Sequence, residues 1–435
     1  MRITYLLADP GIGVFGTKGA SVHVQEMVRA FRQQGHEVTV YCVRRGDTKG
    51  YESVPQDLAD LPVVEVPVQA ASGTAEREIE LQRTALRMVE LAAAGSAEDT
   101  APSELVYERY SLFSDAGAQL AARLGIPLIM EVNAPLVQEQ LTHRSLHHRD
   151  EAVALTERAL AGATVVSCVS EPVATWVRTT VPAAAAQTVV TPNGVNTERI
   201  RPAEHTGHTA RTAQTDPSFT VGFLGTLKPW HGTETLLEAV ARAQHPEQDS
   251  WRIEICGAGP QLESLRTLAA ELGLAEQTVF HGAVAPVDVP GVLTGWDVAT
   301  APYPAPAQDA DHYFSPLKVY EYLSAGLTVV ASGVGELPAV LGTEGDSPAD
   351  GSSTSDTGTV PGVTVGQRGV IVTPGDADAL ARALDLLAGD RALASRLGEA
   401  GRADVVENHT WTSRAQDLLA TVQQRTHTPA EVGRP

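Results

Sequence analysis

The chain has 435 residues, which is too many for one ordinary hydrophobic core, so we expect two domains. Hydrophobic residues make up 43% of it, enough for globular packing, while a net charge of −21 argues against general affinity for nucleic acid or an anionic membrane. The three cysteines, Cys42, Cys168 and Cys256, lie in or beside apolar β-like runs. We interpret them as reduced core residues, as is typical of a cytoplasmic protein.

Strands alternate with helices through the first 200 residues. The run at 3–8 predicts a strand that is too short for a signal peptide, and no apolar run reaches membrane-spanning length. A helix is predicted over 20–34. Further strands are predicted at 37–43, 105–108, 127–132, 164–169 and 188–191. This βαβ rhythm indicates a parallel, doubly wound sheet in a domain of residues 1–200.

The pattern stops in a polar stretch at 201–217, which we interpret as a linker, and restarts in a second domain at 218–401. Strands of the second sheet are predicted at 219–224, 251–256, 278–281, 298–301, 328–331 and 369–372. Helices are predicted at 233–243, 261–272 and 376–387. The fold class is therefore α/β, with two Rossmann-like doubly wound domains.

Three segments stand apart from this rhythm. Residues 342–365 are rich in Gly, Ser, Thr, Asp and Pro and predict a mobile surface loop. A last helix is predicted over about 402–425. The tail at 426–435 is predicted to be disordered.

The stretch from Tyr313 to Gly326 carries the strongest functional signal. It predicts a Pro-broken entry, a short helix and a small-residue turn before the strand at 328–331. Glu321 lies on that helix among apolar neighbours, where a carboxylate is costly unless it has a dedicated partner. Free amides at the helix start form an anion site, and a carboxylate one turn further in can accept two sugar hydroxyls. Together they predict a site for the ribose and diphosphate of a nucleotide sugar.

This stretch resembles the donor-site signature of retaining glycosyltransferases of the GT-B fold, family 4. The resemblance implies two domains facing a cleft, with the nucleotide in the second, and a crossover helix at 402–425. It also implies sugar transfer to a hydroxyl acceptor with no enzyme nucleophile and no cofactor. The family usually has two glutamates separated by seven residues; Glu321 matches the second, and Tyr313 occupies the place of the first.

Two loops after strands are candidate phosphate sites. Gly16, Thr17, Lys18 and Gly19 open the first helix, where glycine backbone and helix amides can approach a phosphate. In the resembled family this loop lies over the donor diphosphate and the acceptor; a plain tight turn is the alternative.

The second loop contains Gly225, Thr226, Lys228 and His231. By resemblance, Thr226 occupies the place of an arginine and His231 that of a lysine, both of which usually contact the diphosphate. We expect Lys228 to neutralise the leaving phosphate, since a fixed cation stabilises the charge that develops there. A surface lysine in a turn is the alternative.

The turn Ser315-Pro316-Leu317-Lys318 is a further donor candidate, with Ser315, Leu317 and Lys318 at the helix start. Lys318 is either a second phosphate partner or a solvated lysine. Gly257 and Gly282 follow two more strands, where the resembled family binds the base. The turn at 191–195 is interpreted as structural.

Acceptor candidates gather in the first domain. Glu131 and Asn133 end a strand and point to the same side; Asn133 lies near the family's usual histidine, and Glu131 is a candidate acceptor base. His23, Arg109 and Arg144 are the other acceptor-binding candidates. For His23 a helix-face residue is the alternative, for Arg109 a structural Arg–Glu pair, and for the basic cluster around Arg144 a solvated face.

Asp309-Ala310-Asp311 and Asp376-Ala377-Asp378 match the metal motif of other transferases, but Asp376 is placed to cap a helix, and we predict no metal. The predicted partners are a nucleotide-sugar donor and a hydroxyl acceptor, with membrane contact at most peripheral. The donor base, the sugar, the acceptor and the oligomeric state are left open. The alternative functions are a sugar-nucleotide epimerase, with Glu131 as the base, and a non-catalytic nucleotide-sugar-binding protein.

Overall fold

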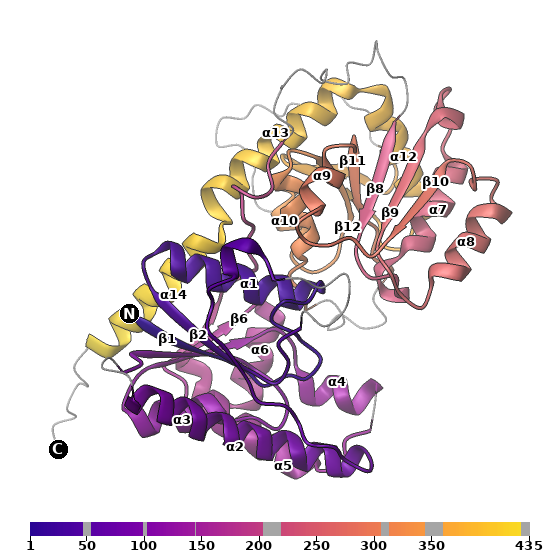
Figure 1. Ribbon diagram of the computed structural model, residues 1–435. Coiled ribbons are helices and arrows are strands. Elements are labelled where there is room, and N and C mark those ends of the chain that lie inside the picture. The colour runs from indigo at the N-terminus through magenta and orange to yellow at the C-terminus, as the bar shows by residue number, and fades with distance from the viewer. Residues whose placement is uncertain are drawn as a thin grey trace. The chain divides into compact units, whose positions relative to one another are not determined.

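The computed structural model describes residues 1–46, 54–98, 102–143, 145–202, 219–305, 313–343 and 360–427. Its contacts divide the chain into two units, each with its own sheet (Figure 1). Unit 1 comprises Met1–Asn193, Tyr313–Ser315 and Trp411–Pro435, and unit 2 comprises Gly194–His312 and Pro316–Thr410.

Unit 1 has a seven-stranded parallel sheet in the order β3-β2-β1-β4-β5-β6-β7. Its strands are β1 (Arg2–Leu7), β2 (Glu37–Cys42), β3 (Val63–Glu65), β4 (Leu105–Arg109), β5 (Leu128–Val132), β6 (Val165–Cys168) and β7 (Thr188–Val190). Its helices are α1 (Gly19–Gln33), α2 (Thr74–Glu98), α3 (Ala116–Leu124), α4 (Leu136–His143), α5 (Arg149–Ala161), α6 (Glu171–Thr180) and α14 (Trp411–His427), with 3-10 turns η1 (Gln56–Leu58) and η2 (Pro182–Gln187). The strand order reverses direction beside β1, and ligands of such sheets bind outside the strands' carboxyl ends at this switch point.

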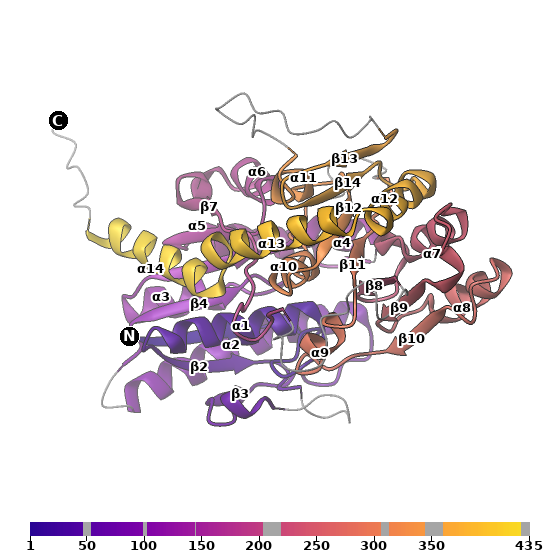
Figure 2. The ribbon, with the colours of Figure 1, turned by 90° about the horizontal axis from the view of Figure 1, so that it is seen from above.

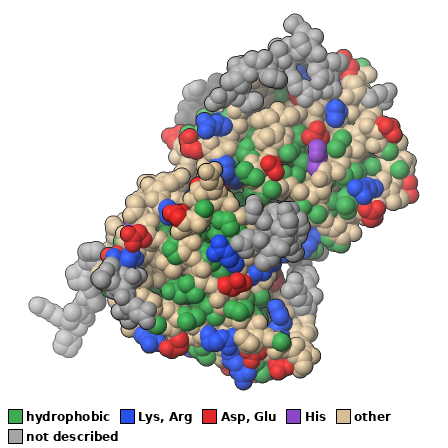
Figure 3. All heavy atoms as spheres, in the orientation of Figure 1, with side chains coloured by type: hydrophobic (Ala, Val, Ile, Leu, Met, Phe, Trp, Pro, Cys, Tyr) green, Lys and Arg blue, Asp and Glu red, His purple; other side chains and the backbone are tan. Residues whose placement is uncertain are grey.

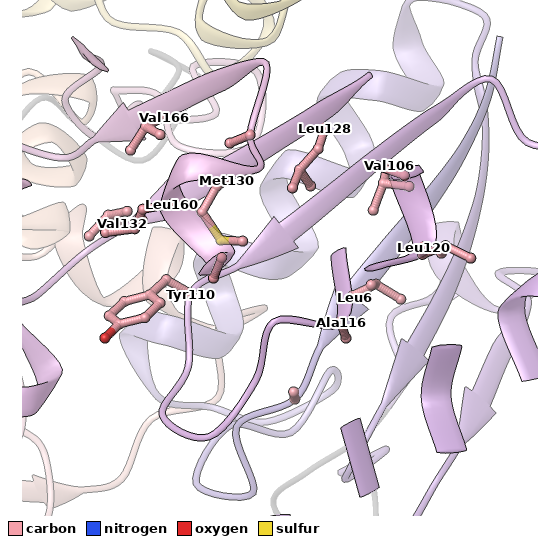
Figure 4. Close-up of a cluster of buried hydrophobic side chains, with 14 of the residues drawn as sticks. Leu6, Val106, Tyr110, Ala116, Leu120, Leu128, Met130, Val132, Leu160 and Val166 are labelled. Atoms are coloured by element: carbon pink, nitrogen blue, oxygen red, sulfur yellow. The ribbon is translucent and has the colours of Figure 1, made fainter. Parts of the chain in front are cut away.

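The core of unit 1 forms where strands of the sheet meet the helices that cover it. Every residue of β4 and β5 is buried, as expected of parallel strands covered on both faces. Figure 4 shows Val106, Leu128 and Met130 from these strands with Leu120 of α3 and Leu160 of α5, all fully buried. This packing fixes the ends of β4 and β5, where the polar candidates lie.

Unit 2 has a second seven-stranded sheet, in the order β10-β9-β8-β11-β12-β14-β13. Its strands are β8 (Thr220–Leu224), β9 (Arg252–Cys256), β10 (Thr278–Gly282), β11 (Val298–Ala301), β12 (Thr328–Ser332), β13 (Val363–Val365) and β14 (Gly369–Val372). Its helices are α7 (Thr233–Arg242), α8 (Leu262–Glu271), α9 (Val289–Leu293), α10 (Leu317–Ser324), α11 (Leu337–Val340), α12 (Ala377–Gly389) and α13 (Arg391–Asn408), with 3-10 turns η3 (Pro229–His231) and η4 (Gln248–Ser250). Here the switch point lies beside β8, so the loops after β8 and β11 are the expected ligand positions.

The α/β fold with two doubly wound sheets is confirmed, but several elements differ from the predictions. The short edge strand β3 was not predicted, and no range was predicted for the helices α2 to α6 of unit 1. Residues 363–365, predicted as part of a loop, form β13, which pairs antiparallel with β14 at the sheet edge (Figure 2). Three residues are too few to show a strand period in the sequence.

The last predicted helix is in fact two helices, α13 and α14. The helical pattern breaks at His409 and Thr410, where the Val195 N–H donates to the His409 carbonyl at 2.8 Å and Val195 bridges to Thr410. This long-range pairing cannot be read from the local pattern. The linker at 201–217 and the tail at 426–435 fall mostly outside the described residues, as do positions 344–359 of the insert, so the predicted domain boundaries stay predictions.

Charge is mixed on the surface. On the face that Figure 3 shows, acidic and basic side chains are interspersed among the coloured residues rather than separated by sign. Among the helices of the described residues, none combines the length and the apolar composition needed to cross a bilayer.

Candidate functional site

Three loops at the carboxyl edge of the unit 2 sheet approach one another backbone to backbone. A Cβ on Gly257, after β9, would lie 1.7 Å from the Gly225 carbonyl oxygen, after β8. A Cβ on Gly232 would lie 1.8 Å from the Pro302 carbonyl oxygen, after β11. No side chain fits at either glycine. The two glycines therefore allow the backbone of the loop after β8 to pack directly against the loops after β9 and β11, close to the switch point.

Lys318, in the first turn of α10, points beneath this loop. Its Nζ lies 4.3 Å from the ring centroid of Phe223 and 5.6 Å from that of Tyr303, and a Cβ on Gly225 would lie 2.7 Å from it. The nitrogen is buried and has no hydrogen-bond partner. Burial lowers the pKa of Lys318 to about 7. The solvated-lysine alternative is therefore wrong, while the predicted phosphate contact stays a prediction.

Lys228 and His231 lie on the same loop and differ in charge. The Lys228 Nζ lies 4.5 Å from the ring of Trp230, whose side chain is 53% exposed. His231 Nδ1 bonds the carbonyl oxygen of Thr226, so this nitrogen carries the hydrogen. Burial and the nearby Lys318 lower the pKa of His231 to about 3. The imidazole is neutral at physiological pH, so among the described residues of this loop region the basic groups that can carry charge are Lys228 and Lys318.

Glu321 has the dedicated partner that its apolar helix demands. Its side chain is only 14% exposed, and Arg199 NH2 lies 3.7 Å from its Oε1. Arg199 also donates to the Pro286 carbonyl at 2.9 Å, which fixes the guanidinium. The sequence analysis missed Arg199. The available signal was the Asn196 turn, where Asn196 Oδ1 accepts from the Arg199 N–H at 3.1 Å.

The entry to α10 is anchored through residues that belong to unit 1. The Asn193 side-chain amide donates to the Ser315 carbonyl at 2.6 Å, and the Asn193 N–H donates to the Ser315 hydroxyl at 3.1 Å. The Tyr313 carbonyl accepts from the Ser170 hydroxyl, and the Tyr313 hydroxyl bonds Glu139. Ser315 and Tyr313 thus hold the segment, and the structural interpretation of the turn at 191–195 agrees with these bonds.

The remaining donor candidates have different surroundings. Leu317 is the first residue of α10. A Cβ on Gly282, at the end of β10, would meet no atom within 4 Å, so that glycine is not forced by packing. Thr226 is exposed. Their predicted contacts with a donor stay predictions.

The acceptor candidates of unit 1 converge on one buried carboxylate. Glu131 is 4% exposed, and its Oε2 lies 2.8 Å from His23 Nε2 and accepts from the Tyr107 hydroxyl. Its Oε1 accepts from Arg109 and from the Asn133 amide. Burial alone would raise the pKa of Glu131, but His23 and Arg109 hold it well below its usual range.

This arrangement joins four of the predicted residues and changes the interpretation of one. A carboxylate that already accepts four hydrogen bonds and binds protons weakly is a poor base. The geometry therefore favours Glu131 as an anchor for His23, Arg109 and Asn133 over the acceptor base that we predicted. The epimerase alternative loses its candidate base for the same reason.

A small cavity adjoins the network. It is lined by His23, Glu131 and Asn133 with Trp411 and Arg414 of α14, and the His23 ring lies 4.6 Å from the Trp411 ring. Its volume of about 10 Å³ has room for roughly one water. A sugar cannot enter this cavity, so His23 acts here as a buried link between α1, β5 and α14.

The glycine loop before α1 is packed tightly at its start and open at its end. A Cβ on Gly16 would lie 2.6 Å from Ser21 Oγ, and Phe15 N–H donates to the Arg45 carbonyl at 2.9 Å. Lys18 and Gly19 are exposed, and α1 begins without a side-chain cap or an acidic residue in its first turn. The amides there suit an anion, and the predicted contacts of Gly16, Thr17, Lys18 and Gly19 stay predictions.

Two other candidates have a structural function or fall outside the described residues. Arg144 is outside them, but its neighbour His148 is paired with Glu78, whose Oε2 accepts from the His148 N–H at 2.8 Å. Asp376 caps α12 by accepting from the Ala379 N–H at 2.9 Å, as predicted, and Asp309 and Asp311 are outside the described ranges. Within those ranges no three His, Cys, Asp or Glu side chains group as metal ligands would.

Two family models match the chain, one in each half. Glycosyltransferase Family 4 matches residues 17–199, and Glycosyl transferases group 1 matches residues 218–390. Among curated proteins, a D-inositol 3-phosphate glycosyltransferase of Stackebrandtia nassauensis is 26% identical over 97% of this chain and 91% of that protein. A GDP-mannose-dependent alpha-(1-6)-phosphatidylinositol monomannoside mannosyltransferase of Mycolicibacterium smegmatis is 26% identical over 46% of this chain and 47% of that protein.

Solved structures with the same fold cover nearly the whole chain. Sucrose-phosphate synthase from Thermosynechococcus elongatus has a TM-score of 0.67 at 20% identity, over 97% of this chain and 98% of that one. Anabaena HepE in complex with UDP has a TM-score of 0.67 at 19% identity, over 98% of this chain and 100% of that one.

Proposed function

Because this chain belongs to the group 1, family 4 glycosyltransferases and has their GT-B fold, we propose that it moves a sugar from a nucleotide-diphosphate sugar to a hydroxyl acceptor. The transfer retains the configuration of the anomeric carbon and uses no metal. The observation that carries the proposal is the edge of unit 2, where the Arg199–Glu321 pair and two lysines flank a close-packed glycine loop.

In this mechanism each residue of unit 2 has one task. Glu321 accepts the two ribose hydroxyls, with Arg199 holding its carboxylate. Lys228 and the first amides of α10 face the diphosphate and stabilise the charge that grows as the sugar–phosphate bond breaks. The departing phosphate accepts the proton of the attacking hydroxyl, which approaches the same face of the sugar. No enzyme nucleophile takes part.

Unit 1 supplies the acceptor side. Asn133 and the exposed Lys18–Gly19 backbone are its polar groups for the sugar or the acceptor, and Glu131 fixes Asn133 through a buried hydrogen bond. The relative that matches nearly the whole chain is named for D-inositol 3-phosphate, so an inositol phosphate is the first acceptor to try. The three buried free cysteines suit a cytoplasmic enzyme.

Donor binding is the first test. Ligands of the folded state raise the melting temperature by mass action, so the purified protein is heated with UDP, GDP and ADP and with their sugars. We expect one nucleotide to raise it and the rise to vanish in Glu321→Ala. If no nucleotide shifts the wild-type protein, the donor site is wrongly assigned.

Turnover with the donor so identified is the second test. Glu321→Ala and Lys228→Ala are each expected to lower kcat/KM at least about 100-fold with an unchanged melting temperature, because each removes a group that contacts the donor. The anomeric configuration of the product, by NMR, checks retention, and an unchanged rate in EDTA checks metal independence. A near-wild-type rate in either variant contradicts the residue assignment.

A further inference from the structure

The side-chain nitrogen of Lys318 is buried and has no acceptor for its hydrogens. Its ammonium nitrogen is covered by protein, faces the rings of Phe223 and Tyr303, and makes no hydrogen bond. Aromatic faces attract a cation, but they do not replace the hydrogen bonds that an ammonium makes in water. A buried donor group left in this way is rare in a folded protein and points to a partner that arrives with a ligand.

The charged groups that face Lys318 do not supply that partner. Glu321, on the same helix, attracts the ammonium but is paired with Arg199. His231 and Lys228, from the loop after β8, are neutral and positive respectively, so neither stabilises a second cation. Tyr303, after β11, and Tyr322, on α10, are phenols whose burial raises the pKa of each, so both stay neutral.

The position of the nitrogen identifies the chemistry of the ligand. It lies directly beneath Gly225, where no side chain intervenes between it and the loop after β8. The same loop carries Thr226 and a neutral His231 where the resembled family has two cations. A diphosphate that approaches this loop would meet too little positive charge unless Lys318 contributes its own.

We propose that at pH 8 Lys318 is neutral in the free protein and takes up one proton from solvent as the diphosphate of the donor enters. The entering anion supplies the missing acceptor and a Coulomb attraction that favours the charged form. Burial lowers the pKa of Lys318 to about 7, so the uptake falls in an accessible pH range. This inference rests on the proposed function, because it requires a diphosphate donor.

Calorimetry of donor binding measures the proton directly. UDP-glucose and GDP-mannose are titrated into the protein at pH 8 in two buffers of different ionisation enthalpy. Their diphosphates have no pKa near neutrality, so any proton bound belongs to the protein. With a pKa of about 7, we expect uptake of about 0.9 proton per donor at pH 8 and about 0.1 at pH 6.

Variants assign the proton to one residue. Lys318→Met keeps an unbranched apolar side chain of nearly the same length without the amine, and is expected to bind the donor at least about 10-fold more weakly with no uptake. Lys228→Met, the matched control, is expected to weaken binding and keep the uptake. His231→Asn is also expected to keep it. Uptake that persists in Lys318→Met but disappears in His231→Asn would overturn the proposal in favour of the imidazole.

Two outcomes separate this inference from the function on which it rests. If the wild-type protein binds neither nucleotide sugar and no other member of the panel, the proposed function fails. If it binds a donor with the same heat in both buffers at pH 8, the proposed function stands and the proton uptake is refuted. The wild-type measurement at two pH values needs no variant, so a misfolded Lys318→Met does not obscure the result.

Discussion

Glu131 in unit 1 and Lys318 in unit 2 are both buried ionisable residues, and their surroundings are opposite. Glu131 accepts hydrogen bonds from four side chains and has two basic neighbours. Lys318 has no hydrogen-bond partner and one acidic neighbour that is already paired. Both lie at the carboxyl edge of a doubly wound sheet, so the difference does not come from the fold.

The difference in hydrogen-bond partners shows which of the two residues has all its partners within the protein. A carboxylate whose oxygens already accept four hydrogen bonds holds its donors in place and has little capacity left for a ligand, so Glu131 acts as an anchor for His23, Arg109 and Asn133. A buried amine with no hydrogen-bond partner in the protein can be paired by a bound anion, which supports our proposal that Lys318 serves the donor. Burial by itself therefore does not separate structural from functional charges; the hydrogen-bond partners do.

The largest expected effect on stability comes from replacing Glu131, the residue whose hydrogen-bond capacity is filled. Glu131→Gln removes the charge opposite Arg109 and His23 and is expected to lower the free energy of unfolding by about 3–5 kcal/mol. Urea denaturation at pH 7 measures the loss. Glu90→Gln is the matched control, because the Glu90–Arg123 pair has a similar contact of 3.0 Å but is exposed, and is expected to change stability by less than about 1 kcal/mol.

The pH dependence of that variant checks the cause. Because the folded pKa of Glu131 is depressed, its contribution to stability is present above the unfolded value of 4.5 and is lost as pH falls toward the folded value. The wild-type protein should therefore lose stability on acidification below pH 4.5 more steeply than Glu131→Gln. Parallel curves for the two proteins would mean that the carboxylate is not held by its donors.

Glu108 tests an intermediate case, a buried carboxyl with two neutral donors. It accepts from the Ser114 hydroxyl and from the Gly117 N–H, both at 2.7 Å, and burial raises its pKa to about 7. A raised folded pKa gives stability below the unfolded value of 4.5 that is lost as pH rises through 7. Glu108→Gln removes the charge, keeps the bond from the Gly117 N–H to its amide oxygen and can reverse the other, its amide N–H donating to the Ser114 hydroxyl. It is expected to gain about 2 kcal/mol over wild type at pH 8.

A comparison of Glu108→Gln with wild type at pH 5 is the control for the comparison at pH 8. There the wild-type carboxyl is mostly protonated, so the two proteins should unfold at nearly the same urea concentration. A Glu108→Gln variant that is equally stable to wild type at pH 8 would show that the carboxylate ionises without penalty, and would weaken the contrast between satisfied and unsatisfied buried charges.

Much of the fold could be predicted because its signals are local. The strands of both sheets are apolar runs flanked by turns, and β4, β5 and β6 appear within a residue or two of the predicted ranges. The misses have different causes: β13 pairs with the nearby β14 but is only three residues long, whereas the break between α13 and α14 depends on Val195, a partner far away in the chain. A local pattern contains no information about such pairs.

The site residues also divide into those that the local sequence indicates and those that only the structure identifies. Glu321 could be found from the sequence because a carboxylate on an apolar helix is unusual, but its partner Arg199 lies 122 residues away and has an ordinary polar context. Glu131, His23 and Arg109 were each identified as candidates, whereas their convergence on one carboxylate needed the register of β4 against β5. Residue type shows where chemistry is possible, and only the paired strands show which groups meet.

The smallest expected effect concerns the neutral anchor of the donor helix. Asn193→Ala removes the bond from the side-chain amide to the Ser315 carbonyl, which fixes the residues before α10. The loss should be about 1 kcal/mol, because the Asn193 Oδ1 is buried without a partner and its removal relieves part of the penalty. Asn408→Ala, whose amide donates to Asp404 at 3.0 Å on the surface, is the control and should change stability by less than about 0.5 kcal/mol.

The functional effect of Asn193→Ala separates an anchor from a donor contact. A looser entry to α10 should raise the KM for the donor several-fold and leave kcat nearly unchanged, since Glu321 and the lysines remain in place once the donor is bound. Hydrogen exchange of the amides at 317–319 should accelerate in the variant and not in Asn408→Ala. A large fall in kcat with unchanged exchange would mean that Asn193 contacts the reacting groups. In that case a residue whose amide is hydrogen-bonded within the protein would also act in the site, and the hydrogen-bond partners alone would not separate structural from functional residues.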